Sequence, residues 1–281
     1  MDTTTHPYLV IGGTGKTGRR VTALLQDRGL PVTPLSRPAF DWAEPATWAT
    51  VERPAAAAYL TFAPDLALPG APEAVAEVAE RMARSGVRRI VLLSGRGEAE
   101  AQRAERLVAE ATARHGAEWA VVRCAFFLQN FDESLFAEPL AAGHVAFVAG
   151  DVREPFVDLD DVAEVAVGLM TGEVPANRVH ELTGPRLLTF AEAVAVIAEA
   201  TGRPIGYEQV APERMVADLV AAGLPDEDAA GLVGLFADIL DGHNAHLSDG
   251  VAVALGRPPA DIATWARAAA AAGAWTAEVA S

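Results

Sequence analysis

The chain has 281 residues, of which 51% are hydrophobic, so it can bury a large core as one domain or as a domain with a smaller lobe. Its formal net charge of -16 argues against a nucleic-acid partner, because phosphate backbones are bound by clustered Lys and Arg. It has one cysteine, no apolar run long enough to cross a bilayer and no signal-peptide pattern at its start, so we expect a cytoplasmic protein without internal disulfides or a membrane partner.

A glycine-rich loop near the start is the strongest signal in the chain. Residues 8–11 are an apolar run typical of a buried strand, and glycines follow at positions 12, 15 and 18, directly before an amphipathic helix pattern. Glycine lets the backbone approach a pyrophosphate closely, and the amides and positive dipole end of the next helix then hold the anion. The loop therefore predicts a dinucleotide site. The alternative is an ordinary glycine-rich turn between a strand and a helix.

The next predicted strand, residues 32–36, ends in Ser36 and Arg37. In dinucleotide-binding sheets an acidic residue at this strand end binds the ribose hydroxyls of NAD, whereas an arginine suits the 2′-phosphate of NADP. Lys16 and Arg19 in the glycine loop add positive charge beside the same phosphate. NADP(H) is therefore the preferred cofactor and NAD(H) the alternative, unless Arg37 is only a solvated surface residue.

Strand and helix patterns alternate through the first half of the chain. Residues 40–42 resemble a strand end that leads into a short helix after Pro45, with Asp41 as an adenine contact or a helix cap. The other expected elements are strands at 56–61, 89–93 and 120–123 and helices at 72–85 and 98–115. This alternation predicts an α/β fold with a doubly wound parallel sheet, which forms a dinucleotide-binding domain over residues 1–150.

Beyond residue 126 the alternation loosens. We expect strands at 145–149 and 179–182, helices at 160–170 and 190–201, the second capped by Thr189, and then a mostly helical, alanine-rich segment. Residues 151–281 are therefore expected to complete the sheet and to form a smaller, mostly helical substrate lobe. The helical end covers the substrate pocket or forms a dimer face, so both a monomer and a homodimer are compatible with the sequence.

Five motifs together resemble the NmrA-like branch of the atypical short-chain dehydrogenases. They are Gly-Gly-Thr-Gly-Lys-Thr-Gly-Arg-Arg at 12–20, Leu-Leu-Ser-Gly-Arg-Gly-Glu at 92–98, Val-Val-Arg-Cys-Ala-Phe-Phe-Leu-Gln-Asn-Phe at 121–131, Pro-Phe-Val-Asp-Leu-Asp-Asp-Val-Ala at 155–163 and Glu-Leu-Thr-Gly-Pro at 181–185. The resemblance implies a Rossmann fold. The branch contains NADPH-dependent reductases of quinones and other conjugated compounds, antibiotic-pathway tailoring enzymes, and redox sensors that bind a dinucleotide without turning it over. Because these functions share one fold, the resemblance leaves function open.

The resemblance also implies roles for individual residues. The pyrophosphate would be bound by Gly12, Thr14, Gly15, Lys16, Thr17 and Gly18. The cofactor's adenosine ribose would lie near Ser36 and Arg37, and its nicotinamide side near Thr61, Phe62 and Ala63. Ser94 ends the strand that carries the catalytic serine in ordinary members, and Arg103 stands where relatives have the lysine that touches the nicotinamide ribose. The substrate would be bordered by Phe126, Phe127, Asn130, Phe131 and Phe156.

The usual proton donor of short-chain dehydrogenases is missing. Those enzymes use a Tyr with a Lys four residues later, and the Lys lowers the pKa of the Tyr so that it can protonate an alkoxide. This chain has one lysine, in the glycine loop, and none of its tyrosines (Tyr8, Tyr59 and Tyr207) has a lysine four residues on. Losing a positioned general acid costs about 10² to 10⁴ in rate, or about 3 to 5 kcal/mol of barrier. A simple ketone could hardly react under that penalty.

A quinone or conjugated enone suits such a site better. Hydride transfer to it leaves a phenolate or enolate, which is a much weaker base than an alkoxide, so solvent or a modest donor can finish the step. Arg96 and Arg103 are candidate catalytic residues through electrostatic stabilisation. Ser94 is a third candidate, as a hydrogen-bond donor to a substrate carbonyl, or else it is simply the polar end of a buried strand.

These observations predict an NAD(P)H-dependent oxidoreductase that acts on a quinone-like or polycyclic aromatic compound. Tailoring of aromatic polyketides, including net oxygenation of the reduced aromatic, is a variant of this function. The main alternative is a non-catalytic NADP(H) sensor, which the missing Tyr and Lys favour and the many phenylalanines oppose. An isomerase or dehydratase that keeps the fold without net redox change is a third hypothesis.

Other reactive residue types carry weaker signals. Cys124 follows a strand within an apolar stretch and is expected to be a buried thiol. His243 and His246 lack a partnered cysteine or a third histidine, so we predict no metal site. No flavin is expected either. The acidic run at 158–161 is best interpreted as a helix start, where carboxylates meet the helix dipole.

Overall fold

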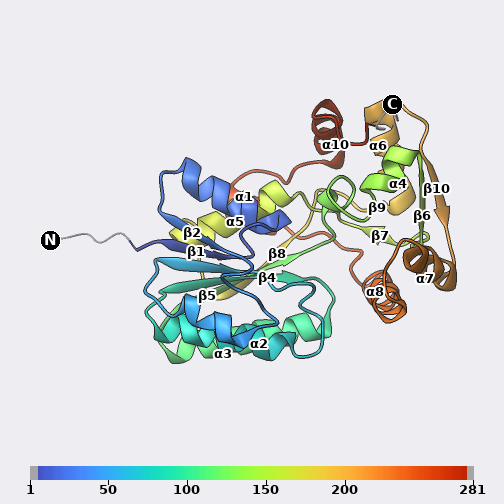
Figure 1. Ribbon diagram of the computed structural model, residues 1–281. Coiled ribbons are helices and arrows are strands. Elements are labelled where there is room, and N and C mark those ends of the chain that lie inside the picture. The colour runs from blue at the N-terminus through green and yellow to red at the C-terminus, as the bar shows by residue number, and fades with distance from the viewer. Residues whose placement is uncertain (1–5, 277–281) are drawn as a thin grey trace. The chain divides into compact units, whose positions relative to one another are not determined.

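A parallel sheet organises one of two compact units in the computed structural model (Figure 1). Its strand order is β2-β1-β3-β4-β5-β8, and every neighbouring pair is parallel. The strands are β1 (Tyr8–Ile11), β2 (Val32–Leu35), β3 (Ala57–Leu60), β4 (Arg89–Gly95), β5 (Glu118–Cys124) and β8 (Arg178–Leu182). The predicted doubly wound α/β fold is thereby confirmed.

Helices cover both faces of this sheet. On one face α1 (Lys16–Asp27) packs against α5 (Leu159–Thr171), and on the other α2 (Ala71–Arg84) packs against α3 (Ala99–Arg114), as Figure 1 shows. The buried side chains of α2 recur at helical spacing, so one face of the helix is apolar and lies on the core. A shorter helix, α9 (Gly250–Leu255), contacts α5 and β8.

The structure describes residues 6–276, and its two units interleave along the chain. The first unit comprises the chain up to Cys124 together with residues 159–182 and 249–258, and the second comprises the remainder. The sequence predicts a dinucleotide-binding domain over residues 1–150 and a later segment that completes the sheet. In the structure β8 is the sixth strand of the first sheet, and α5 belongs to the same unit. Residues 1–5, where no signal-peptide pattern is found, lie outside the described residues. No helix within residues 6–276 is long and apolar enough to cross a membrane.

The second unit is mostly helical and has two small sheets. Strand β6 (His144–Phe147) pairs in parallel with β10 (Gly206–Gln209), and β7 (Arg153–Glu154) pairs antiparallel with β9 (Leu188–Thr189). Its helical elements are η2 (Leu128–Asn130), α4 (Ala137–Ala142), α6 (Phe190–Thr201), α7 (Pro212–Ala221), α8 (Asp226–Ile239) and α10 (Ile262–Ala271). Aromatic and aliphatic side chains from these elements form its core.

Local differences from the predicted elements have simple physical reasons. Residues 40–42 form no strand, because the chain turns here: the amide of Phe40 donates to the carbonyl oxygen of Ser36 at 3.1 Å. The Phe40 ring packs edge-on against Trp42, with ring centroids 4.9 Å apart, before the short helix η1 (Pro45–Val51). The expected strand at 145–149 ends at Phe147 and belongs to the small β6–β10 sheet. Helix α6 matches its predicted range, and Thr189 caps it by accepting a hydrogen bond from the amide of Glu192 at 3.1 Å.

Candidate functional site

The carboxyl edge of the six-stranded sheet gathers most of the predicted site residues. Strand β2 lies on one side of β1 and β3 lies on the other side, so the strand order reverses at β1. Ligands of open α/β sheets bind in the crevice that such a reversal creates at the carboxyl ends of the strands. The loops that follow β1, β2, β3 and β4 all lie at this edge.

The glycine loop after β1 is closely packed, and its glycines are required by space. A Cβ atom on Gly18 would lie 2.7 Å from the carbonyl carbon of Gly12, and one on Gly12 would collide with the methyl group of Thr61. Gly12 also has a φ of +75°, a conformation that residues with a side chain rarely adopt. No side chain caps the first turn of α1, and that turn holds no acidic residue. This cradle fits an anion at the helix N-terminus, as the sequence predicts.

Ser36 holds the glycine loop to the end of β2. Its hydroxyl oxygen accepts hydrogen bonds from the amide of Thr14 at 3.2 Å and from the hydroxyl of Thr14 at 3.1 Å. The next residue, Arg37, is exposed and has no ion-pair partner among residues 6–276. Its guanidinium is therefore compatible with both sequence interpretations, a phosphate ligand and a surface residue.

The segment after β3 is held by tryptophan. The indole N–H of Trp42 donates to the carbonyl oxygen of Thr61 at 3.0 Å, and the Trp42 ring lies 4.9 Å from the ring of Phe62, centroid to centroid. Phe62 and Thr61 are half-buried and Ala63 is exposed. The segment lies beside the glycine loop, because a Cβ atom on Gly12 would meet the side chain of Thr61. Its position beside the nicotinamide stays a prediction.

The ends of β4, β5 and β8 carry a buried polar network. The hydroxyl of Ser94 donates to Glu105 at 2.6 Å, and Glu105 also accepts from the guanidinium of Arg123 at 2.9 Å. Arg123 lies 3.6 Å from Glu181, which in turn accepts from Arg96 at 2.9 Å. Hydrogen bonds with Glu105 raise the pKa of Arg123 and keep it charged. The network connects α3 with three neighbouring strands.

This network contains two of the three residues predicted to be catalytic. Ser94 and Arg96 are both nearly inaccessible, with exposed fractions of 3% and 4%. Their observed partners are Glu105 and Glu181, so their contacts in this structure stabilise the strand ends. Sequence reasoning missed Glu105, Arg123 and Glu181, because the partners lie 11 to 85 residues apart along the chain.

Arg103, the third predicted catalytic residue, lies on the surface of α3. Its guanidinium donates to Glu73 of α2 and, at 3.2 Å, to Glu100. The hydrogen bond from Arg103 lowers the pKa of the Glu73 carboxyl. The structure thus places this arginine in an exposed ion-pair cluster between two helices.

Glu98, which the sequence analysis did not single out, lies three residues after the end of β4. Its carboxyl group folds back over Gly95, where a Cβ atom would come within 2.6 Å of the carboxyl carbon of Glu98. Burial raises the pKa of Glu98 to about 8, with further contributions from the negative charges of Asp65 and Glu105. The signal that could have found it is a glutamate that follows two glycines at a strand end, Gly95 and Gly97.

The phenylalanines predicted to border the substrate all lie in the second unit. Phe131 and Phe156 are core residues, exposed by 0% and 3%, and their ring centroids are 5.5 Å apart. Phe126 and Phe127 are half-buried, and Phe126 packs edge-on against Phe156 at 6.0 Å. Asn130 accepts a hydrogen bond from Ser134 at 3.3 Å. Within this unit Phe126, Phe131 and Phe156 belong to one aromatic cluster.

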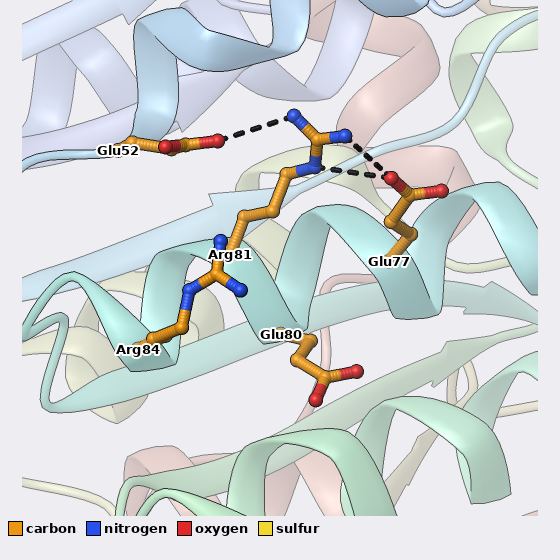
Figure 2. A pocket seen from close by; sticks show the side chains of 5 residues that line it. All are labelled: Glu52, Glu77, Glu80, Arg81 and Arg84. Atoms are coloured by element: carbon orange, nitrogen blue, oxygen red, sulfur yellow. Dashed lines mark hydrogen bonds and ion pairs between the residues drawn. The ribbon is translucent and has the colours of Figure 1, made fainter.

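A surface cavity of about 250 Å³ lies elsewhere, along the outer side of α2 (Figure 2). Figure 2 shows the guanidinium of Arg81 between Glu77, at 2.5 Å, and Glu52, at 3.1 Å. Exposed ion pairs of this kind contribute about 0 to 1 kcal/mol each to stability. The cavity is lined by charged residues only, and none of the predicted site residues reaches it.

Two further predictions concern reactive side chains. Cys124 is buried at the end of β5, as expected, and burial raises the pKa of its thiol. His243 and His246 are exposed. Within residues 6–276 no group of three or more His, Cys, Asp or Glu side chains is arranged to hold a metal ion. Asp160 and Asp161 lie in the first turn of α5, which agrees with a helix start.

The chain is similar in sequence to oxidoreductases along nearly its whole length. The oxidoreductase YesF of Bacillus subtilis is 29% identical over 274 residues, which cover 94% of this chain and 95% of that protein. The NAD(P)H azoreductase of Xenophilus azovorans is 29% identical over 287 residues, covering 94% and 98%. Festuclavine dehydrogenase easG of Aspergillus fumigatus is 29% identical over 285 residues, covering 92% and 96%. No model of a known protein family matches the chain.

Solved structures share the fold. The triphenylmethane reductase of Citrobacter sp., in complex with NADP(H), superposes with a TM-score of 0.73 at 18% identity and covers 94% of this chain and 99% of its own. The NADPH-dependent quinone oxidoreductase QOR2 of Escherichia coli, with NADPH, has a TM-score of 0.72 at 18% identity, with 92% and 98% covered. A mutant of NmrA has a TM-score of 0.70 at 14% identity, with 94% and 95% covered.

These comparisons confirm the resemblance to NmrA-like, atypical short-chain dehydrogenases. They also support the coarser part of the predicted function, an oxidoreductase of that kind. At identities of 14% to 18% the solved structures show the fold alone. Substrate and reaction therefore have to be argued from the site.

Proposed function

We propose that this chain is an NADPH-dependent reductase that delivers hydride to a planar conjugated substrate of the quinone or dye type. Bound NADPH would supply the hydride. The glycine loop would hold the pyrophosphate by backbone amides, and Arg37 would pair with the 2′-phosphate. The relatives support this class of substrate, because azo dyes, triphenylmethane dyes and quinones, named for three of the similar proteins, are all conjugated acceptors.

The observation that carries the proposal is the state of the three tyrosines. Tyr59 is fully buried in the middle of β3, and burial raises the pKa of its hydroxyl far above the ordinary value. Tyr8 begins β1, at the edge opposite the candidate crevice. Tyr207 is in the second unit, where its hydroxyl donates to the carbonyl oxygen of Ala149, and burial raises its pKa too. None is therefore suited to protonate an alkoxide, which favours a substrate whose reduced form is a weak base.

A spectrophotometric assay tests the proposal. NADPH and NADH oxidation would be followed with a panel of quinones and an azo dye, and we expect turnover that prefers NADPH. Arg37→Ala should raise the KM for NADPH about 10- to 100-fold, the value of one charge-assisted hydrogen bond of about 1.5 to 3 kcal/mol, and should leave NADH unaffected. Arg88→Ala is the matched control, because Arg88 is an exposed arginine at the amino end of β4.

One outcome would change the assignment. Tight NADPH binding without oxidation by any acceptor would favour the non-catalytic sensor. A finer part of the proposal is that the reduced aromatic then reacts with oxygen, as in the tailoring of aromatic polyketides. Running the assay with and without air tests it, because a product with an added oxygen atom should form only in air.

A further inference from the structure

We propose that Glu98 is the proton donor of this reduction and acts from the end of β4. This inference rests on the proposed function and assigns the role that the missing tyrosine has in ordinary short-chain dehydrogenases. It is carried by the position of the residue in the crevice, by the space that the structure provides for its carboxyl group, and by the charges around it.

The strand order places Glu98 at the nicotinamide end of the crevice. A pyrophosphate held by the loop after β1 would direct the adenosine half toward Ser36 and Arg37 at the end of β2. The other half of the dinucleotide must then extend in the opposite direction, over the ends of β3 and β4. Glu98 is the first residue with a carboxyl group after β4, three residues beyond the strand end at Gly95.

The loop is shaped to hold this carboxyl group against the strand. Gly97 has a φ of +82°, which turns the chain so that residue 98 folds back. Gly95 has no positive φ, and the place that its Cβ atom would take is filled by the carboxyl group of Glu98, whose carboxyl carbon lies 2.6 Å from that position. Although Glu98 occupies the N-cap position of α3, its side chain makes no capping hydrogen bond. The carboxyl group thus lies against the carboxyl end of β4 and does not cap the helix.

Burial, and after it two neighbouring carboxylates, raise the pKa of the Glu98 carboxyl group. Asp65, in the loop after β3, and Glu105, on α3, both act on it by charge repulsion. Asp65 is held by the amide of Ala67, which donates to it at 2.8 Å, and Glu105 is held by Ser94 and Arg123. With a pKa of about 8, Glu98 carries its proton at neutral pH and can release it to a base.

Hydride transfer adds two electrons and one hydrogen nucleus to the quinone and leaves a hydroquinone anion. The O–H bond of Glu98 breaks and an O–H bond forms on that anion, so the product is the neutral hydroquinone and Glu98 becomes a carboxylate. Glu98 is half-buried, so water can return the proton to it before the next turnover.

Direct observation of the proton is the first test. Infrared spectra of the protein without cofactor, subtracted from those of Glu98→Gln, should show a protonated carboxyl band that is lost with a midpoint near pH 8. Asp65→Asn should move that midpoint to lower pH, because one repelling charge is removed. Glu110→Gln, an exposed glutamate on the same helix, is the matched control and should leave the band unchanged. A midpoint near the ordinary value of 4.5 would overturn the proposal.

Kinetics separate this inference from the proposed function. Glu98→Gln should lower kcat by about 10- to 100-fold and remove the fall in kcat above pH 8, while KM for NADPH stays unchanged. The loss should grow along a series of quinones as the hydroquinone anion becomes more basic. Unchanged kcat and pH profile in Glu98→Gln would overturn the role of Glu98 and leave the reductase intact. No turnover by the unmodified protein with any acceptor would overturn both.

Discussion

In Gly18→Ala, the effect of the substitution on helix propensity and its effect on packing should have opposite signs. Gly18 lies in the first turn of α1, where helix propensity alone favours alanine over glycine by about 1 kcal/mol. The added methyl group would lie 2.7 Å from the carbonyl carbon of Gly12, whereas ordinary contacts begin at 3.4 Å. The glycine loop and α1 must therefore move apart by more than half an ångström.

We expect the steric effect to dominate. Forcing a methyl group into a packed site typically costs about 1 to 3 kcal/mol, which equals or exceeds the propensity gain. The displaced loop would also lose its fit to the pyrophosphate, so the Kd for NADPH should rise at least about 10-fold, the equivalent of about 1.4 kcal/mol. NADPH fluorescence titration measures the affinity, and thermal unfolding measures the stability.

Gly231→Ala supplies the matched control. Gly231 lies in the exposed part of α8, and nothing is within 4 Å of the Cβ position. The same substitution there should stabilise the protein by about 0.5 to 1 kcal/mol and leave NADPH binding unchanged. If Gly18→Ala also stabilised the protein and bound NADPH normally, the close approach of the loop to α1 would not be the reason for glycine at this position.

The remaining predictions concern the polar groups at the strand ends. Ser94→Ala should lower the free energy of unfolding by about 1 to 3 kcal/mol, because buried Glu105 loses a hydrogen-bond donor at 2.6 Å; equal denaturation midpoints for the two proteins would contradict this. Stability should also fall as pH rises from about 4.5 to 8. The folded-state pKa of Glu98 is raised above its ordinary value, so its contribution is complete below pH 4.5 and is lost as pH rises through 8. The free energy of unfolding should fall by at most about 4 to 5 kcal/mol, and by less where water reaches the carboxyl group. Urea titrations at several pH values measure this free energy, and for Glu98→Gln it should depend less steeply on pH.

Much of the fold was predictable because it depends on local patterns. The glycine loop, the six strands of the main sheet and helix α6 with its cap each have a signal within a dozen or so residues. The pairing of β6 with β10 was not predictable, since it joins segments about 60 residues apart that have no distinctive pattern. The course of residues 40–42 depends on where Phe40 and Trp42 find apolar surface, which only the folded chain defines.

In the candidate site, the position of the glycine loop could be predicted from the sequence better than the roles of the side chains. Glycine spacing reports a loop geometry directly, so the expected pyrophosphate cradle could be placed from sequence. Side-chain chemistry depends on partners: Ser94 has a different role once Glu105 lies at 2.6 Å, and Arg96 once Glu181 lies at 2.9 Å. The perturbed state of Glu98 likewise depends on Asp65 and Glu105, which approach it only through the fold.

The acid at this site can be understood from the charges that the chain has available. An ordinary short-chain dehydrogenase begins with an acid that is too weak, a tyrosine, and lowers its pKa with a nearby lysine. This chain has one lysine, but 38 acidic residues against 22 basic ones. It can instead begin with an acid that is too strong, Glu98, and raise its pKa by burial and by neighbouring carboxylates. Both routes lead toward a proton donor with a pKa near neutral pH, and the second requires no cation.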